Sequence, residues 1–236
     1  MKFLATLAAI ASALAFSSAQ AVEVTGGDVA FGYSTYTDDT DVSKFAVTGA
    51  VEIGFTPNLA LQFDAGAHAF NLIDETGTNL TLHGIYHANE QVSFGGFYGN
   101  DRLFGDNQDF YGLETGFEAG AANGELYIAH AEDSGFDVNI TGLSGSYGFD
   151  HGFTLGGSLQ YADFDGGLDV TRLGATGTYT VNPAFDVYAE LGTVKASAFG
   201  FSNSEPYFGI GAAMTFGADR GATFGRRGLF ELLPGL

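Results

Sequence analysis

Residues 44–55 read KFAVTGAVEIGF, and the larger apolar residues of this stretch fall on alternate positions. Side chains of a β-strand point alternately to its two faces, so the spacing predicts a strand with one apolar face and one small or polar face. After Thr56-Pro57-Asn58, residues 59–67 (LALQFDAGA) repeat the alternation. Proline fixes φ and asparagine tolerates a left-handed backbone, so a tight turn is expected between two strands.

The same alternation recurs over most of the chain. We predict about twelve strands, with ten or fourteen as alternatives, at residues 27–36, 44–55, 59–70, 78–88, 91–99, 109–119, 124–132, 135–147, 152–163, 168–181, 184–195 and 205–216. The pattern changes phase between Ile140 and Tyr147, which predicts a β-bulge there. A tilted strand needs ~9–11 residues to cross the apolar layer of a membrane, and most of these segments are long enough. The predicted fold class is all-β, an antiparallel transmembrane β-barrel.

The connections predict two different ends of the barrel. Turns after even-numbered strands are tight, whereas several connections after odd-numbered strands are longer and acidic, as at residues 37–43, 71–77 and 100–108. Short turns on one side and longer loops on the other are typical of outer-membrane barrels. An even number of strands places both termini on the periplasmic side.

The N-terminal residues predict secretion. Lys2, the apolar run at residues 3–16 and the small residues Ala19 and Ala21 have the layout of a removable signal peptide, here residues 1–21. A membrane-anchoring helix is the alternative, but the apolar run is short for a span. We expect the barrel to occupy residues 22–216 and a C-terminal tail to occupy residues 217–236.

The composition excludes several function classes. The chain has 36 glycines, 23 phenylalanines and 11 tyrosines but no cysteine, which excludes disulfides and thiolate metal sites. A net charge of −20 opposes binding to nucleic acid, because phosphates would be repelled. The same charge is compatible with the handling of cations.

The polar faces of the strands are too charged to contact lipid, so we expect the apolar faces outside and the polar faces around a lumen. The predicted pore-lining residues are Glu52, Asp64, His68, His83, His87, Glu114, Glu118, Glu125, Asp137, Arg172, Asp186 and Glu190. Acidic residues dominate this set, and charged rings of one sign select counter-ions, which predicts a cation preference. For each residue the alternative is a solvated or ion-paired wall position without a role in selectivity.

The signal-peptide layout, the alternating glycine and aromatic residues and the final strand, residues 207–216 (YFGIGAAMTF), resemble the outer-membrane porin superfamily. The resemblance implies a location in a bacterial outer membrane, contact with its lipid and with the barrel-insertion machinery, and passive passage of ions or small hydrophilic solutes. Such proteins usually end at the aromatic residue of the last strand, whereas this chain continues to Leu236.

The tail carries Arg220, Arg226 and Arg227, followed by a mostly apolar run. We expect a flexible periplasmic extension, as is common at chain termini. The alternative is that the basic cluster binds an anionic surface or the acidic lumen.

No catalytic pair or cofactor site is predicted. His130 and Ser144 lie on neighbouring predicted strands, but the hairpin register separates them by about 20 Å, too far for a nucleophile and its base. His68, His83 and His87 offer a metal site as an alternative to plain wall positions, which we favour. The leading function is therefore a cation-leaning porin that is not an enzyme. A closed-lumen surface protein and a secreted soluble β-protein are the alternatives, and the oligomeric state is open.

Overall fold

The computed structural model describes residues 23–133, 136–217 and 221–234. The predicted signal peptide, with its cleavage residues Ala19 and Ala21, lies outside these ranges.

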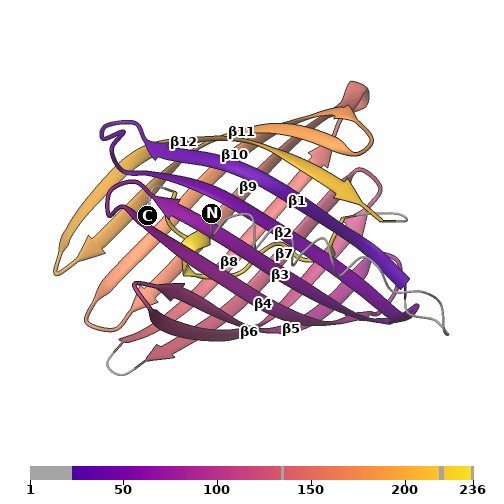
Figure 1. Ribbon diagram of the computed structural model, residues 1–236, viewed down its shortest axis with the longest axis horizontal. Coiled ribbons are helices and arrows are strands. Elements are labelled where there is room, and N and C mark those ends of the chain that lie inside the picture. The colour runs from indigo at the N-terminus through magenta and orange to yellow at the C-terminus, as the bar shows by residue number, and fades with distance from the viewer. Residues whose placement is uncertain (1–22, 134–135, 218–220, 235–236) are drawn as a thin grey trace.

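The described chain forms twelve antiparallel strands that close into a barrel, which confirms the predicted fold class (Figure 1). The strands are β1 (Glu23–Tyr36), β2 (Ser43–Thr56), β3 (Leu59–Phe70), β4 (Glu75–His87), β5 (Val92–Leu103), β6 (Asp106–Ala119), β7 (Ala122–Asp133), β8 (Phe136–Gly148), β9 (Phe153–Phe164), β10 (Leu168–Asn182), β11 (Phe185–Ala198) and β12 (Phe201–Phe216). Each strand pairs with its neighbours in sequence, and β1 pairs with β12 to close the ring. A closed ring leaves no unpaired strand edge, as a spanning sheet in lipid requires.

The ends of the barrel differ less than the sequence predicts. The connections after β1 and β3 span residues 37–42 and 71–74, but the predicted loop at 100–108 is a two-residue turn at Phe104 and Gly105. Both turn residues have positive φ, 55° and 92°, which lets β5 and β6 extend into the expected loop. We call the end with the turns β2–β3 to β10–β11 the even-turn mouth and the opposite end the odd-loop mouth. Glu23 at the start of β1 and Phe216 at the end of β12 lie at the even-turn mouth, as the even strand count predicts.

The predicted bulge in β8 is wrong. β8 pairs with β7 and with β9 without a register shift. The apparent change of phase arises because Val138 and Ile140 are buried inside the barrel, whereas Leu143 and Tyr147 are exposed on the outside.

The outer face is apolar, as expected for a membrane barrel. Leucines near the middle of strands are among its most exposed side chains, including Leu191 (68%) and Leu113 (64%). Exposed aromatic pairs lie at the even-turn mouth, with ring centroids 5.0 Å apart for Tyr147 and Phe149 and 4.9 Å apart for Phe153 and Tyr179. Aromatic residues at this position are typical of the interfacial girdle of outer-membrane barrels.

The inner face is not uniformly polar. Buried apolar side chains form a cluster inside the barrel that includes Tyr36, Phe97, Phe110, Val138, Val194, Tyr207 and Leu232. Leu232 belongs to the chain beyond β12, so part of the tail is inside the barrel. The helical segments in the described residues are the single turns η1 (Asp150–Gly152) and η2 (Leu229–Glu231). Among these residues no helix is long and apolar enough to cross a membrane.

Candidate functional site: an occupied lumen

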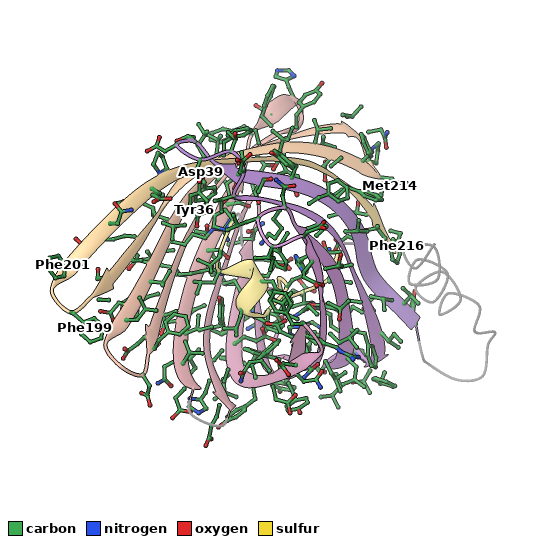
Figure 2. The ribbon with its side chains drawn as sticks, turned by 60° about the vertical axis from the view of Figure 1, so that its left-hand side comes forward. Tyr36, Asp39, Phe199, Phe201, Met214 and Phe216 are labelled. Carbon is green, nitrogen blue, oxygen red and sulfur yellow. The ribbon has the colours of Figure 1, made fainter. Side chains whose placement is uncertain are left out.

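Residues 221–234, which we call the luminal segment, lie inside the ring of strands. Figure 1 shows the yellow chain after β12 returning through the barrel, and Figure 2 shows η2 enclosed by the strands. The expected periplasmic extension is therefore wrong for these residues. The other interpretation of the sequence, binding inside the acidic lumen, is what the structure shows.

The luminal segment runs lengthwise from the even-turn mouth toward the odd-loop mouth. Near its start, the backbone N–H of Thr223 donates to Glu52 Oε2 at 2.8 Å. Near its end, the carbonyl of Pro234 accepts a hydrogen bond from Ser34, close to the far end of β1. The segment therefore occupies the central part of the lumen.

Side chains of the wall satisfy the backbone of the segment. The amide of Gln62 accepts from the N–H of Phe224 at 3.1 Å and donates to the carbonyl of Phe224 at 2.7 Å. Asp101 Oδ2 accepts from the N–H of Leu229 at 2.5 Å. Lys44 Nζ donates to the carbonyl oxygens of Phe230 and Leu233, the latter at 2.7 Å. A buried backbone needs such partners, and here the wall supplies them in place of a neighbouring strand.

Arg227 is bound in a site made by three wall residues. Its Nη2 and Nε donate to Glu114 Oε2 at 2.8 and 3.1 Å, and Nη2 also donates to Glu125 Oε1 at 2.5 Å. The guanidinium carbon lies 4.1 Å from the ring centre of Tyr127, a cation–π contact. Burial opposes the charge of Arg227, but Glu125 and Glu114 outweigh that effect and raise the pKa of the guanidinium.

Arg226 forms a second ion pair, with Asp28 of β1. Its Nη2 donates to Asp28 Oδ2, but its buried Nε has no hydrogen-bond partner within the described structure. Arg226 is therefore less completely satisfied than Arg227. The Arg226–Asp28 pair is therefore expected to stabilise the bound segment less than the Arg227 contacts do, since a buried donor without a hydrogen bond is unfavourable.

Glu231 introduces a negative charge among cationic groups. Burial alone would raise the pKa of its carboxyl, but His68, Lys44, Arg226 and Arg172 together lower that pKa below the ordinary value. Arg172 also donates to the backbone carbonyl of Glu231 at 2.7 Å. The segment thus carries charges of both signs, each facing its opposite on the wall.

A buried hydrogen-bonded chain lies beside Arg227. His83 Nδ1 lies 2.7 Å from Glu114 Oε1, and His83 Nε2 lies 3.1 Å from Asp64 Oδ2. The side chains of His83, Asp64 and Glu114 are each 0% exposed. Glu114 therefore joins a wall network to the luminal segment, and it contacts both His83 and Arg227.

The structure places most of the predicted pore-lining residues on the inner face. These are Glu52, Asp64, His68, His83, His87, Glu114, Glu118, Glu125, Arg172, Asp186 and Glu190, which share the buried alternation of their strands. Glu52, Asp64, Glu114 and Glu125 meet at the luminal segment or its hydrogen-bonded neighbours. Asp186 lies apart from this group, with a buried Oδ1 that has no partner in the described structure.

Asp137 is the exception, because it lies on the outer face. It shares that face with exposed Asn139 and Leu143, while Val138 between them is buried. The prediction fails because the apolar residues at this end of β8 point inward, which reverses the usual assignment of faces. Donor atoms of Asp137, His130 and Glu132 lie within 4.8 Å of one another on the outside of the barrel.

The sequence analysis missed several residues that contact the segment. Asp28, Lys44 and Asp101 are inward-facing and bind Arg226, the carbonyl groups near η2 and the N–H of Leu229, respectively. Alternation along β1 and β2 could have identified Asp28 and Lys44. Asp101 lay in the region expected to be a loop, so its face could not be assigned.

An acidic vestibule precedes the segment at the even-turn mouth. A cavity of about 570 Å³ opens there, and its lining includes Glu23, Glu52, Glu90, Glu118, His87 and Asn58. The vestibule shares Glu52 with the luminal segment, since the N–H of Thr223 donates to Glu52 Oε2.

The barrel matches known structures of channel proteins. It matches the KdgM porin in complex with disordered oligogalacturonate with a TM-score of 0.64 at 12% sequence identity, over 80% of this chain and 99% of that chain. The fold is that of a small outer-membrane porin.

Further matches agree with this fold. The NanC porin matches with a TM-score of 0.60 at 12% identity, over 80% of this chain and 98% of that chain. An outer membrane channel from Pseudomonas putida F1 matches with a TM-score of 0.53 at 15% identity, over 84% and 97% of the two chains. No protein-family model and no curated protein sequence matches this chain. At these identities the likeness is one of fold.

Proposed function

We propose that the protein is a channel of the bacterial outer membrane that lets small cations and small hydrophilic solutes diffuse passively. In this proposal the barrel contacts outer-membrane lipid, is inserted by the barrel-insertion machinery, and catalyses no reaction. The observation that carries the proposal is the excess of carboxylates over cationic groups on the inner wall.

The charges of the inner wall support a preference for cations. The inward-facing acids include Asp28, Glu52, Asp64, Asp101, Glu114, Glu118, Glu125, Asp186 and Glu190, whereas the inward-facing cations of the strands include Lys44 and Arg172. Low-dielectric walls that carry one sign of charge concentrate counter-ions. The acidic vestibule lies where this effect acts on entering solutes.

We do not propose the ligand of the KdgM structure as a solute of this channel. That structure is a complex with disordered oligogalacturonate, an oligomer of acidic sugars. An acidic wall would repel such an oligomer, so we propose that the present channel takes cationic and neutral solutes.

Planar bilayers test the proposal with the full processed chain. We expect stepwise conductance and a reversal potential that indicates cation preference in a potassium chloride gradient. Glu118→Gln, at the vestibule, should lower the cation preference, whereas the matched change Asp137→Asn on the outer face should leave it unchanged. Absence of conductance steps in both wild type and a variant with a released luminal segment, or a preference for anions, would contradict the proposal.

A second candidate is a closed outer-membrane surface protein with a structural or adhesive role. Two observations favour it: the luminal segment fills the middle of the barrel, and Phe199 and Phe201 at the tip of the β11–β12 hairpin are 86% and 82% exposed (Figure 2). Liposomes that contain the protein would separate the two candidates. Swelling in small sugars supports the channel, and its absence under conditions that release the segment supports the closed surface protein.

A further inference from the structure

The contacts of the luminal segment resemble those between a protein and a bound peptide more than those of a packed core. Wall carboxylates accept hydrogen bonds from its backbone, at Thr223, Gly225 and Leu229. Its aromatic side chains fill spaces left by glycines, since a Cβ at Gly77 would lie 2.7 Å from the ring of Phe230. The wall is therefore complementary to an extended cationic peptide.

The site of Arg227 has the elements of a guanidinium-binding site. Glu114 and Glu125 supply two carboxylates, and Tyr127 supplies an aromatic face 4.1 Å from the guanidinium carbon. A planar guanidinium can donate several hydrogen bonds and stack at once, which a lysine ammonium cannot. The site should therefore prefer guanidinium to ammonium.

Asp28, on β1, provides a second site for a cationic group, occupied here by Arg226. β1 lies across the closed ring from β6 and β7, which carry Glu114 and Glu125, so the consecutive residues Arg226 and Arg227 bind opposite walls and the two sites together suit a dication. These two sites lie on the path that connects the acidic vestibule with the odd-loop mouth, since Thr223 precedes them and Pro234 follows them along the lumen.

We propose that the luminal segment is a built-in ligand: its Arg226–Arg227 pair occupies two carboxylate sites that bind the guanidinium groups of a cationic solute, and such a solute displaces the segment to open the channel. This inference rests on the proposed channel function and names both its solute class and its regulation. The segment is covalently attached a few residues after β12, and a covalent attachment of this length corresponds to an effective concentration on the order of millimolar. A free dication that bound as tightly as the whole segment would compete at about millimolar concentration, and one that lacks the segment's other contacts would need a higher concentration.

Accessibility of the segment can be measured directly. The chain has no cysteine, and Leu232 is 2% exposed, so Leu232→Cys should react slowly with a membrane-impermeant maleimide until the segment leaves the lumen. The probe is the arginyl-arginine dipeptide, with the lysyl-lysine dipeptide and the uncharged citrulline dipeptide as matched controls. We expect a saturable rise in labelling with arginyl-arginine, a weaker one with lysyl-lysine and none with the citrulline dipeptide.

Variants of the segment and of the wall show which contacts hold the segment in the lumen and which bind the dipeptide. In the Leu232→Cys background, Arg227→Ala should raise basal labelling at least about tenfold, because a buried hydrogen-bonded charge pair is broken. Arg226→Ala should have a smaller effect, since the Arg226 site is less completely satisfied. Glu125→Gln should weaken the response to the dipeptide. Heat-modifiable migration on gels shows that each variant has kept its folded barrel.

The outcomes distinguish the inference from the proposed function. Equal labelling with arginyl-arginine and the citrulline dipeptide, or wild-type labelling of Arg227→Ala, would overturn the inference even if the channel conducts. Rapid labelling of Arg227→Ala without conductance would overturn the channel function and leave the two sites as binding sites of a closed barrel. Conductance that rises with arginyl-arginine in parallel with labelling supports both.

Discussion

Gln62 pairs with the backbone of Phe224 in both directions, donating to its carbonyl oxygen at 2.7 Å and accepting from its N–H at 3.1 Å. Through these two bonds a wall side chain satisfies one residue of the segment as a neighbouring strand would. Both groups are buried, so neither can exchange its partner for bulk water without moving.

Replacing Gln62 should loosen the segment without opening the barrel wall. Gln62→Met retains the approximate volume but removes the two hydrogen bonds to Phe224 and the one donated to Asp64 Oδ1, and each buried group left unsatisfied costs about 1–3 kcal/mol. We expect faster maleimide labelling in the Leu232→Cys background. Gln91→Met, at an exposed position in the β4–β5 turn, is the control, and equal labelling rates in the two variants would contradict the prediction.

A methyl group at Gly77 should displace η2. Its Cβ would lie 2.7 Å from Cζ of Phe230, and overpacking of this kind costs about 1–3 kcal/mol. Gly77→Ala should therefore increase labelling, and Phe230→Ala in the same chain should relieve the clash. Gly84→Ala on the outer face of β4 is the matched control, since its nearest atom would be 3.9 Å away. Equal labelling rates of Gly77→Ala and Gly84→Ala would show that the ring of Phe230 does not lie against Gly77.

Acid should weaken binding of the segment through Glu231. The pKa of this carboxyl is lower in the bound segment than its ordinary value of 4.5, so its ionisation stabilises the bound state above that pH. The stabilisation is lost as the pH falls through the lower pKa of the bound segment. The part due to Glu231 is the difference in labelling between wild-type and Glu231→Gln segments, each in the Leu232→Cys background. This difference in labelling should be constant near neutral pH and should shrink as the pH falls. A difference that grew in acid would contradict the prediction.

A charge on the outer face should oppose membrane insertion. Leu191 lies near the middle of β11 and is 68% exposed, so Leu191→Arg places a cation at the apolar belt. The expected loss of folding free energy in lipid is about 2–4 kcal/mol, measured by denaturant titration in vesicles. Asn139→Arg, on the outer face near the start of β8, should cost much less because the effect falls to ~0–1 kcal/mol near the interface. Equal losses would indicate that the belt does not face hydrocarbon.

The strands and their faces could be predicted because alternation is a local property. Phe45 and Val47 are separated by one residue and must share a face in any extended chain, so the apolar exterior follows once the polar face is too charged for lipid. The assignment of residues to the inner or outer face was wrong where the alternating pattern is locally ambiguous. Val138 and Ile140 are as apolar as any outward residue, and only the packing inside the barrel explains why they face inward and Asp137 does not.

By itself the sequence determined an antiparallel barrel of about twelve strands, with its apolar exterior and acidic interior, because these depend on contacts between neighbouring residues and neighbouring strands. Only the tertiary structure decided that residues 221–234 occupy the lumen. Arg227 is separated from Glu114 by 113 positions, and no periodicity links them. Their contact exists because the closed ring brings distant carboxylates around one axis, where a cationic segment can neutralise several of them at once.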